Sequence, residues 1–153
     1  MALREIRTFD DPVLCKKSRP VREVDDKIRE LLRDMADTMY HTPNGGGLAA
    51  CQVGILKRLV VIDLGDGLIQ LVNPEITEAQ GEQLVTEGCL SFPNVWAKLR
   101  RPARVTVKAL NELGRPVTIR GEGVMAKCLC HELDHLDGIV FTEKADSFLQ
   151  PRG

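Results

Sequence analysis

Two histidines with a glutamate between them stand near the end of the chain, in the run His131-Glu132-Leu133-Asp134-His135. On a helix the two rings lie one turn apart and project from one face, so they can bind a single metal ion. Glu132 lies roughly 60° around the helix from His135. A carboxylate there stands beside the ion and can accept a proton from a water molecule. The alternative is a polar helix face that binds nothing, because short motifs of this kind also occur by chance.

A catalytic metal site usually has three protein ligands and one position open to water or substrate. Cys89, which we expect in a loop next to Gly88, is the best candidate for the third ligand because a thiolate donates charge strongly. Spacing alone does not choose Cys89 over Cys51, and a free cysteine most often packs as a small apolar residue. We expect no separate site at Cys128 and Cys130, since residues two apart on a helix face different directions.

The residues that flank the histidines predict the helix that must carry them. Gly121 and Gly123 mark a loop or a helix start, and Gly138 is a helix-stop residue at the other end. One stripe of this helix holds Val124, Cys128, His131 and His135. Because the stripe is apolar at its start, we expect the helix to run through the core into the site.

The rest of the chain predicts an α+β fold. Residues 26–41 have the apolar spacing of an amphipathic helix, capped at Asp25 and Asp26. Strands are expected at residues 59–63, 68–72, 105–110 and 117–120, with turns at residues 65–67 and 111–114. We expect mainly antiparallel strands packed around a central metal-binding helix, with an N-terminal amphipathic helix, in a single domain of residues 1–153.

Composition excludes several classes of protein. The 21 basic and 22 acidic side chains nearly cancel, which argues against direct binding of nucleic acid. No apolar run approaches the ~20 residues of a membrane span, and residues 1–7 lack the apolar stretch of a signal peptide. Five cysteines are an odd number, which favours reduced thiols over a disulfide framework. We therefore expect a cytoplasmic protein that does not bind membranes.

A third run, Gly45 to Gln52, is rich in small residues, which allow a ligand or a neighbouring backbone to approach closely. It lacks the Lys-Ser/Thr end of a phosphate-binding loop and follows no predicted strand, so we exclude nucleotide binding. A glycine-rich turn into a buried strand and a role in the site both remain open.

The three runs together resemble the motifs of the peptide deformylase family. The first has the form Gly-x-Gly-apolar-Ala-Ala-x-Gln at Gly45 to Gln52, and the second reads Glu-Gly-Cys-apolar-Ser at Glu87 to Ser91. The third has the form His-Glu-x-Asp-His-Leu-x-Gly at His131 to Gly138. The resemblance extends from Ile6 to about Phe141 and leaves the roles of Trp96, Lys127 and Cys130 open.

This resemblance implies a metal-dependent amidase that removes the formyl group from the N-terminal methionine of newly synthesised proteins and releases formate. Cys89, His131 and His135 would bind one Fe²⁺ per chain, which Ni²⁺, Co²⁺ or Zn²⁺ can replace. Glu132 would act as general base and then as general acid while activated water attacks the formyl carbon.

The resemblance also assigns the rest of the site. The side-chain amide of Gln52 and the backbone N–H of Leu90 would stabilise the oxyanion. Substrate would be bound by Gly45, Gly46, Gly47, Glu87, Gly88 and Cys128. The expected partners are N-formylmethionyl peptides and nascent chains at the ribosome, and the expected state is a monomer.

Two other functions remain as alternatives. Another metallohydrolase, such as a peptidase or a deacylase, could use the same site on a different substrate. A non-catalytic metal-binding module would need a fourth ligand that closes the site, or would lack the base, and Glu132 is present. A protease with a third histidine after the helix is excluded, since no histidine follows His135.

Overall fold

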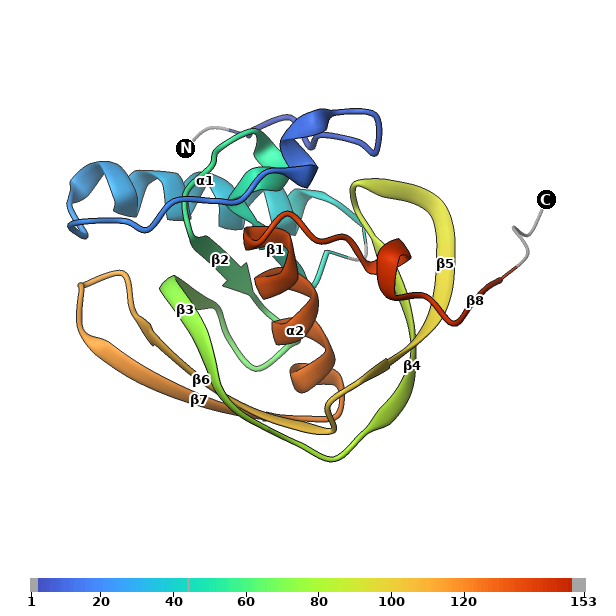
Figure 1. The fold of residues 1–153 in the computed structure, drawn as a ribbon. Coiled ribbons are helices and arrows are strands. Elements are labelled where there is room, and N and C mark those ends of the chain that lie inside the picture. Colours follow the sequence, from blue (N-terminus) through green and yellow to red (C-terminus); the bar gives the residue numbers. More distant parts are fainter. Residues whose placement is uncertain (1–2, 44, 150–153) are drawn as a thin grey trace.

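In the computed structural model, which describes residues 3–43 and 45–149, two α-helices pack with two antiparallel sheets (Figure 1). This confirms the predicted α+β class. The helices are α1 (Asp26–His41) and α2 (Val124–Leu136). Three short 3₁₀ helices are η1 (Pro12–Cys15), η2 (Ala50–Val53) and η3 (Phe141–Lys144). Among the described residues no helix is long and apolar enough to span a membrane.

The larger sheet has five strands in the order β1-β2-β3-β6-β7. Its strands are β1 (Gly47–Ala49), β2 (Leu59–Ile62), β3 (Ile69–Gln80), β6 (Arg104–Leu110) and β7 (Pro116–Glu122). Both predicted hairpins are confirmed, since Ile62 pairs with Ile69 and Leu110 pairs with Pro116. The strand predicted at residues 68–72 continues to Gln80, because its outer half pairs with β6.

The smaller sheet, in the order β4-β5-β8, was not predicted. Its strands are β4 (Gln83–Cys89), β5 (Phe92–Arg101) and β8 (Ser147–Phe148). The prediction of a loop around Cys89 is wrong, because Cys89 ends β4 and pairs with Phe92 of β5. Gly88 and Pro93 indicate a turn in the sequence, but the turn between these strands contains only Leu90 and Ser91. The candidate ligand therefore lies at the end of a strand, beside an irregularity in the β4–β5 pairing between Glu87 and Cys89.

Helix α1 covers the β1 and β2 side of the large sheet. The side chain of Asp25 accepts a hydrogen bond from the Ile28 N–H and so caps the first turn. The apolar stripe of α1 is buried and contains Ile28, Leu32, Met35 and Met39. It packs against Leu48, Leu59 and Val61. This contact anchors the sheet edge from which the glycine-rich run reaches the site.

Helix α2 lies between the two sheets (Figure 1). Ala126, Leu129, Leu133 and Leu136 are buried in the core that α2 shares with the large sheet. Another face of α2 carries Val124, Lys127, Cys128, His131 and Glu132, which line a pocket. The expectation that the ligand stripe starts in the core is wrong, because the Val124 side chain is 61% exposed. The stripe that contains the histidines lies along the pocket wall, and the buried apolar residues of α2 form a neighbouring face of the helix.

Candidate metal centre

Cys89, His131 and His135 come together as a group that could hold a metal ion, with ligand atoms within 4.8 Å of one another. The sulfur of Cys89 lies 3.3 Å from Nε2 of His135. Metal–sulfur and metal–nitrogen bonds of about 2.3 and 2.1 Å at tetrahedral angles separate two ligand atoms by about 3.6 Å, so the cluster fits an ion. Cys51 is outside this group, because its thiol donates to the backbone carbonyl of His135 at 3.4 Å.

Glu87 fixes the ring of His131. Its Oε1 lies 2.7 Å from Nδ1 of His131. A carboxylate only accepts hydrogen bonds, so Nδ1 carries the proton and Nε2 is the nitrogen available to an ion. Burial opposes the charge on Glu87, but hydrogen bonds from Arg101 and His131 outweigh burial and lower its pKa to about 2. Glu87 is therefore a buried carboxylate that stays ionised.

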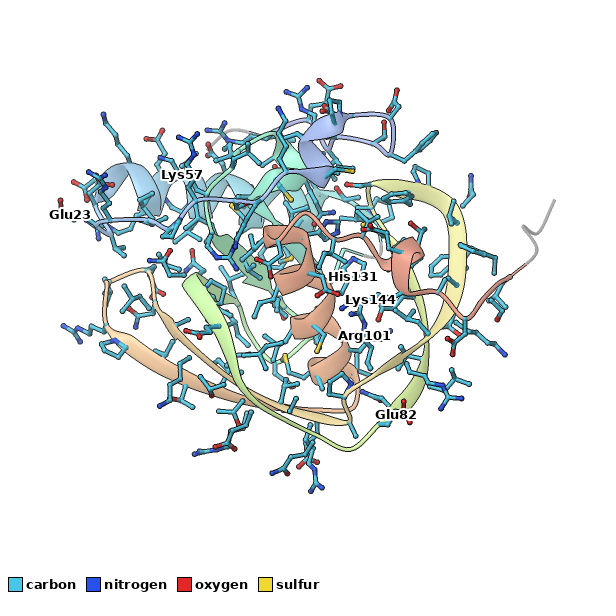
Figure 2. All side chains as sticks on the ribbon, in the orientation of Figure 1. Glu23, Lys57, Glu82, Arg101, His131 and Lys144 are labelled. Atoms are coloured by element: carbon cyan, nitrogen blue, oxygen red, sulfur yellow. The ribbon has the colours of Figure 1, made fainter. Side chains whose placement is uncertain are left out.

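A buried charge network continues from Glu87 away from the ligands. Arg101 donates to both carboxylate oxygens of Glu87, at 2.7 and 2.9 Å, and to Asp134 at 2.6 Å. Lys144 from η3 also lies 3.0 Å from Asp134. Figure 2 shows Arg101, Lys144 and His131 in the same region beside α2. The sequence prediction missed this network, although the alternation of Ala97, Leu99 and Arg101 along β5 would have placed Arg101 inside.

The electrostatics of the two histidines differ. Burial and the nearby charge of His131 lower the pKa of His135 to about 3, so its ring is neutral, as a ligand must be. Burial opposes the charge on His131, but hydrogen bonds with Cys89 and Glu87 outweigh burial and raise its pKa to about 10. A cation that binds here therefore displaces a proton from His131.

Glu132 is a buried carboxylate that no hydrogen bond from the described residues holds. It is 4% exposed, and its Oε1 has no hydrogen-bond partner. Burial raises its pKa to about 7, while the charge of His131 acts in the opposite direction. Because Glu132 also lines the pocket, it can exchange a proton there near neutral pH.

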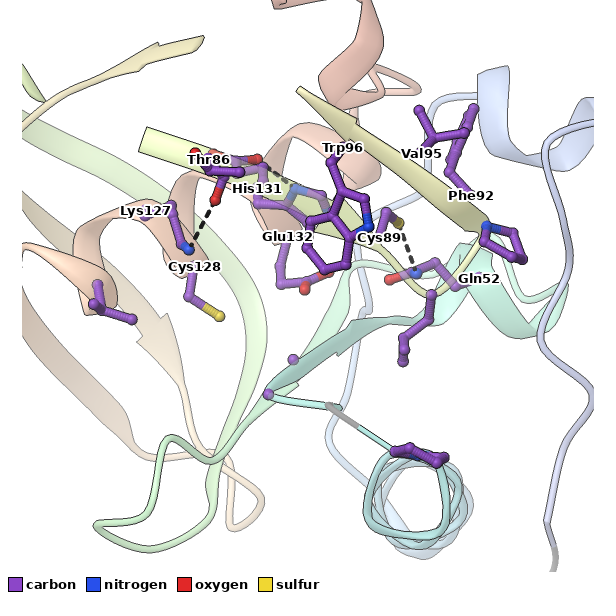
Figure 3. A pocket seen from close by; sticks show the side chains of 18 of the residues that line it. Gln52, Thr86, Cys89, Phe92, Val95, Trp96, Lys127, Cys128, His131 and Glu132 are labelled. Carbon is purple, nitrogen blue, oxygen red and sulfur yellow. Dashed lines mark hydrogen bonds and ion pairs between the residues drawn. The ribbon is translucent and has the colours of Figure 1, made fainter. Parts of the chain in front are cut away.

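The pocket beside these groups has a volume of about 490 Å³ (Figure 3). Of the predicted site residues, its wall contains Gly46, Gly47, Gln52, Glu87, Gly88, Cys89, Leu90, Cys128, His131 and Glu132. His135 is fully buried and does not form part of this wall. Gly45 is also outside it: a Cβ at that position would collide with the backbone oxygen of Met39. Glycine at position 45 therefore allows the backbone there to pass close to the last turn of α1.

Gln52 lies beside the candidate ligand Cys89, and Gly47 lies against Glu132. The Oε1 of Gln52 accepts from the Ala49 N–H at 2.9 Å, and its Nε2 donates to Ser91 Oγ at 3.2 Å and towards Cys89 Sγ at 3.5 Å. A Cβ on Gly47 would lie 2.7 Å from Oε2 of Glu132. The glycine-rich run is therefore both a turn into a buried strand and part of the pocket wall.

Comparison with known proteins gives one consistent family. The family model of polypeptide deformylase matches residues 3–150. Peptide deformylase 2 of Clostridium acetobutylicum is 59% identical over 150 residues, which cover 98% of this chain and 100% of that protein. The peptide deformylase of Acetivibrio thermocellus is 56% identical over 149 residues, which cover 97% of this chain and 87% of that protein.

Solved structures agree. Peptide deformylase from Thermotoga maritima has a TM-score of 0.92 and 39% identity, covering 95% of this chain and 99% of that one. A peptide deformylase from Synechococcus elongatus in complex with actinonin has a TM-score of 0.90 and 39% identity, covering 94% of this chain and 79% of that one. Since the match spans nearly all of its residues, the chain belongs to the peptide deformylase family of enzymes.

Proposed function

We propose that this chain, as a single catalytic domain of residues 1–153, removes the N-formyl group from the N-terminal methionine of newly synthesised proteins. The observation that supports this most is the placement of Glu132 beside the Cys89–His131–His135 cluster, with one carboxylate oxygen free of hydrogen bonds. We infer that it works in the cytoplasm as a monomer on N-formylmethionyl peptides and on nascent chains at the ribosome, with no direct binding of nucleic acid.

Cys89, His131 and His135 would hold one divalent ion, which we propose is Fe²⁺, with Ni²⁺, Co²⁺ or Zn²⁺ as substitutes. One sulfur and two nitrogen donors suit all four ions. When bound, such an ion supplies Lewis-acid activation that brings the pKa of water from ~15.7 towards ~7. Glu87 keeps the His131 ring in place for this role through the 2.7 Å contact to Nδ1.

Glu132 would move the proton. Its unpartnered oxygen accepts a proton from the attacking water, and the carboxylic acid then donates that proton to the leaving amine. The Gln52 side-chain amide and the Leu90 backbone N–H would donate to the oxyanion that forms when the formyl carbon is attacked. The loss of one such donor typically lowers the rate by about 10²–10³.

Substrate would be held by the walls around these groups, with Gly46, Gly47, Gly88 and Cys128 in contact and Glu87 orienting the strand. Gly45 is proposed to act only through the backbone, because it does not line the pocket. The close approach of Gly47 to Glu132 leaves little space beside the reacting carbon. A formyl group fits such a space better than an acetyl group, which carries an additional methyl.

The test is formate release from formyl-Met-Ala-Ser by anaerobically purified protein, with metal content measured on the same sample. We expect release with about one ion per chain, abolished by a chelator, and no comparable release of acetate from acetyl-Met-Ala-Ser. Glu132→Gln keeps the ion and should lose most of the activity. Parental turnover by Glu132→Gln would refute the role of the base. No release from a metal-loaded sample would favour another acyl substrate.

A further inference from the structure

An exposed tryptophan stands on the wall of the pocket. Trp96, the only tryptophan of the chain, is 47% exposed and lines the pocket together with the exposed side chains of Leu64 and Val124. Exposed apolar side chains around a pocket are typical of a surface that binds a ligand. The chemistry proposed above uses the ligand cluster, Glu132 and Gln52, and leaves Trp96 without a role.

The position of the indole is set by its neighbours on the strands. Ala97, the next residue of β5, is fully buried and pairs with Glu87, so Trp96 faces the opposite side of the sheet. There the ring rests directly on Gly88: a Cβ at Gly88 would lie 2.5 Å from Cζ3 and 2.7 Å from Cε3 of the indole. The backbone oxygen of Trp96 accepts from the Leu149 N–H at 2.9 Å.

The pocket therefore has two different walls. Figure 3 shows Lys127 and Cys128 on the α2 wall and the indole of Trp96 on the β5 wall. In an extended peptide successive side chains point to opposite sides, about 3.3 Å apart along the chain. If the formyl group reaches the ligand cluster and the first side chain lies along the α2 wall near Cys128, the second side chain points to the β5 wall.

We propose that Trp96 is a specificity-determining residue, which makes this chain prefer N-formylmethionyl substrates whose second residue is aromatic. This inference rests on the proposed function. A ring at the second position can stack on the exposed indole, whereas alanine is too short to make the same contact. The Gly88 backbone beneath the indole supports the ring, so the contact needs no large rearrangement.

The test compares kcat/KM for formyl-Met-Phe-Ser and formyl-Met-Ala-Ser on the same enzyme sample, which cancels differences in metal content and in folded fraction. The parent should prefer the phenylalanine peptide roughly tenfold, the effect of a favourable aromatic pair. Trp96→Ala should bring the ratio close to one, and Trp96→Phe should retain most of it. Leu84→Ala is the matched control, since Leu84 is an exposed apolar residue of β4 outside the pocket wall and should keep the parental ratio.

Intrinsic fluorescence gives a second result that does not depend on turnover. Because Trp96 is the only tryptophan, its emission should change as the product peptide Met-Phe-Ser is added, at lower concentration than with Met-Ala-Ser. Equal kcat/KM ratios in the parent and in Trp96→Ala, or unchanged emission at high concentrations of Met-Phe-Ser, would overturn the proposal. If no formylated peptide is cleaved at all, the proposed function fails, and the emission change alone then decides whether bound peptide contacts Trp96.

Discussion

Replacing Arg101 by methionine tests the buried charge network behind the candidate metal ligands. Methionine keeps an unbranched side chain but removes every donor. The variant loses two hydrogen bonds to Glu87 and one to Asp134, all between 2.6 and 2.9 Å. The side chains of Arg101 and Glu87 are each only 2% exposed, so water cannot replace the lost donors unless the strands separate.

The size of the effect follows from the state of Glu87. Hydrogen bonds from Arg101 and His131 overcome burial and lower its pKa from 4.5 to about 2, which corresponds to about 3 kcal/mol at about 1.36 kcal/mol per pKa unit. Removing one partner of a buried pair costs about 3–5 kcal/mol in general. We expect Arg101→Met to lower the free energy of unfolding by about 3 kcal/mol. Metal affinity should also fall by about 10–100-fold, because Glu87 no longer holds His131 as firmly.

The assay is urea unfolding of parent and variant in the presence of a chelator at pH 7, with metal affinity measured separately on folded protein. Arg100→Met is the matched control on the neighbouring residue. Arg100 is 62% exposed and pairs with Glu82 and Asp146 at 3.4 and 3.3 Å, so its loss should cost less than about 1 kcal/mol. Similar losses in the two variants would refute the argument that burial gives the network its importance.

The pH dependence supplies a second check on the same reasoning. Because the pKa of Glu87 is lowered on folding, its stabilising contribution is present above about pH 4.5 and is lost as the pH falls to about 2. The difference in unfolding free energy between parent and Arg101→Met should therefore shrink across this range. A difference that stays constant down to pH 2 would mean that lost packing of the arginine stem, and not the ion pair, dominates.

Two further predictions concern other parts of the site. Gly47→Ala places a Cβ 2.7 Å from Oε2 of Glu132 and should displace that carboxylate. Formate release should then fall by at least about tenfold while the melting temperature changes little. Full activity in this variant would contradict the close approach of Gly47 to Glu132. Burial raises the pKa of the Cys51 thiol to about 12, so iodoacetamide at pH 8 should modify the exposed Cys15 first and leave Cys51 unmodified in folded protein. Mass analysis of the peptides measures which cysteine is alkylated. Early alkylation of Cys51 would contradict its burial.

The sequence predicts those parts of the fold that depend on local patterns. The helix of residues 26–41 has an N-cap aspartate and a regular apolar stripe, and the two predicted hairpin turns contain glycine at their positions of positive φ, Gly65, Gly67 and Gly114. The histidine pair also follows from local spacing, because both candidate ligands lie on one helix. The choice between Cys89 and Cys51 is different: both thiols lie against His135, but only that of Cys89 contacts the ring, whereas that of Cys51 contacts the backbone carbonyl, and spacing carries no such information.

The small sheet shows why the other elements were missed. Its strands β4 and β5 join through two residues, and the glycine and proline around Cys89 favour a loop when only the sequence is considered. Near its start β5 contains Pro93 and Asn94, residue types that strands disfavour. Only the pairing of β4 with β5 and the packing of Leu99 against Phe141 make this segment a strand. Pairing between strands is a tertiary effect that overrides local propensity.

The site is assembled from both sheets, and this links metal binding to folding. Cys89 comes from the end of β4, the histidines lie on α2, whose apolar face packs in the core of the large sheet, and Gln52 lies on η2. An unfolded chain cannot bring these donors within 4.8 Å, so an ion that binds the folded state adds directly to its stability. At a free ion concentration 1,000 times Kd this amounts to about 4.1 kcal/mol. Chelation should therefore lower the melting temperature of the parent but leave that of Cys89→Ala almost unchanged, because that variant has already lost a ligand from the small sheet.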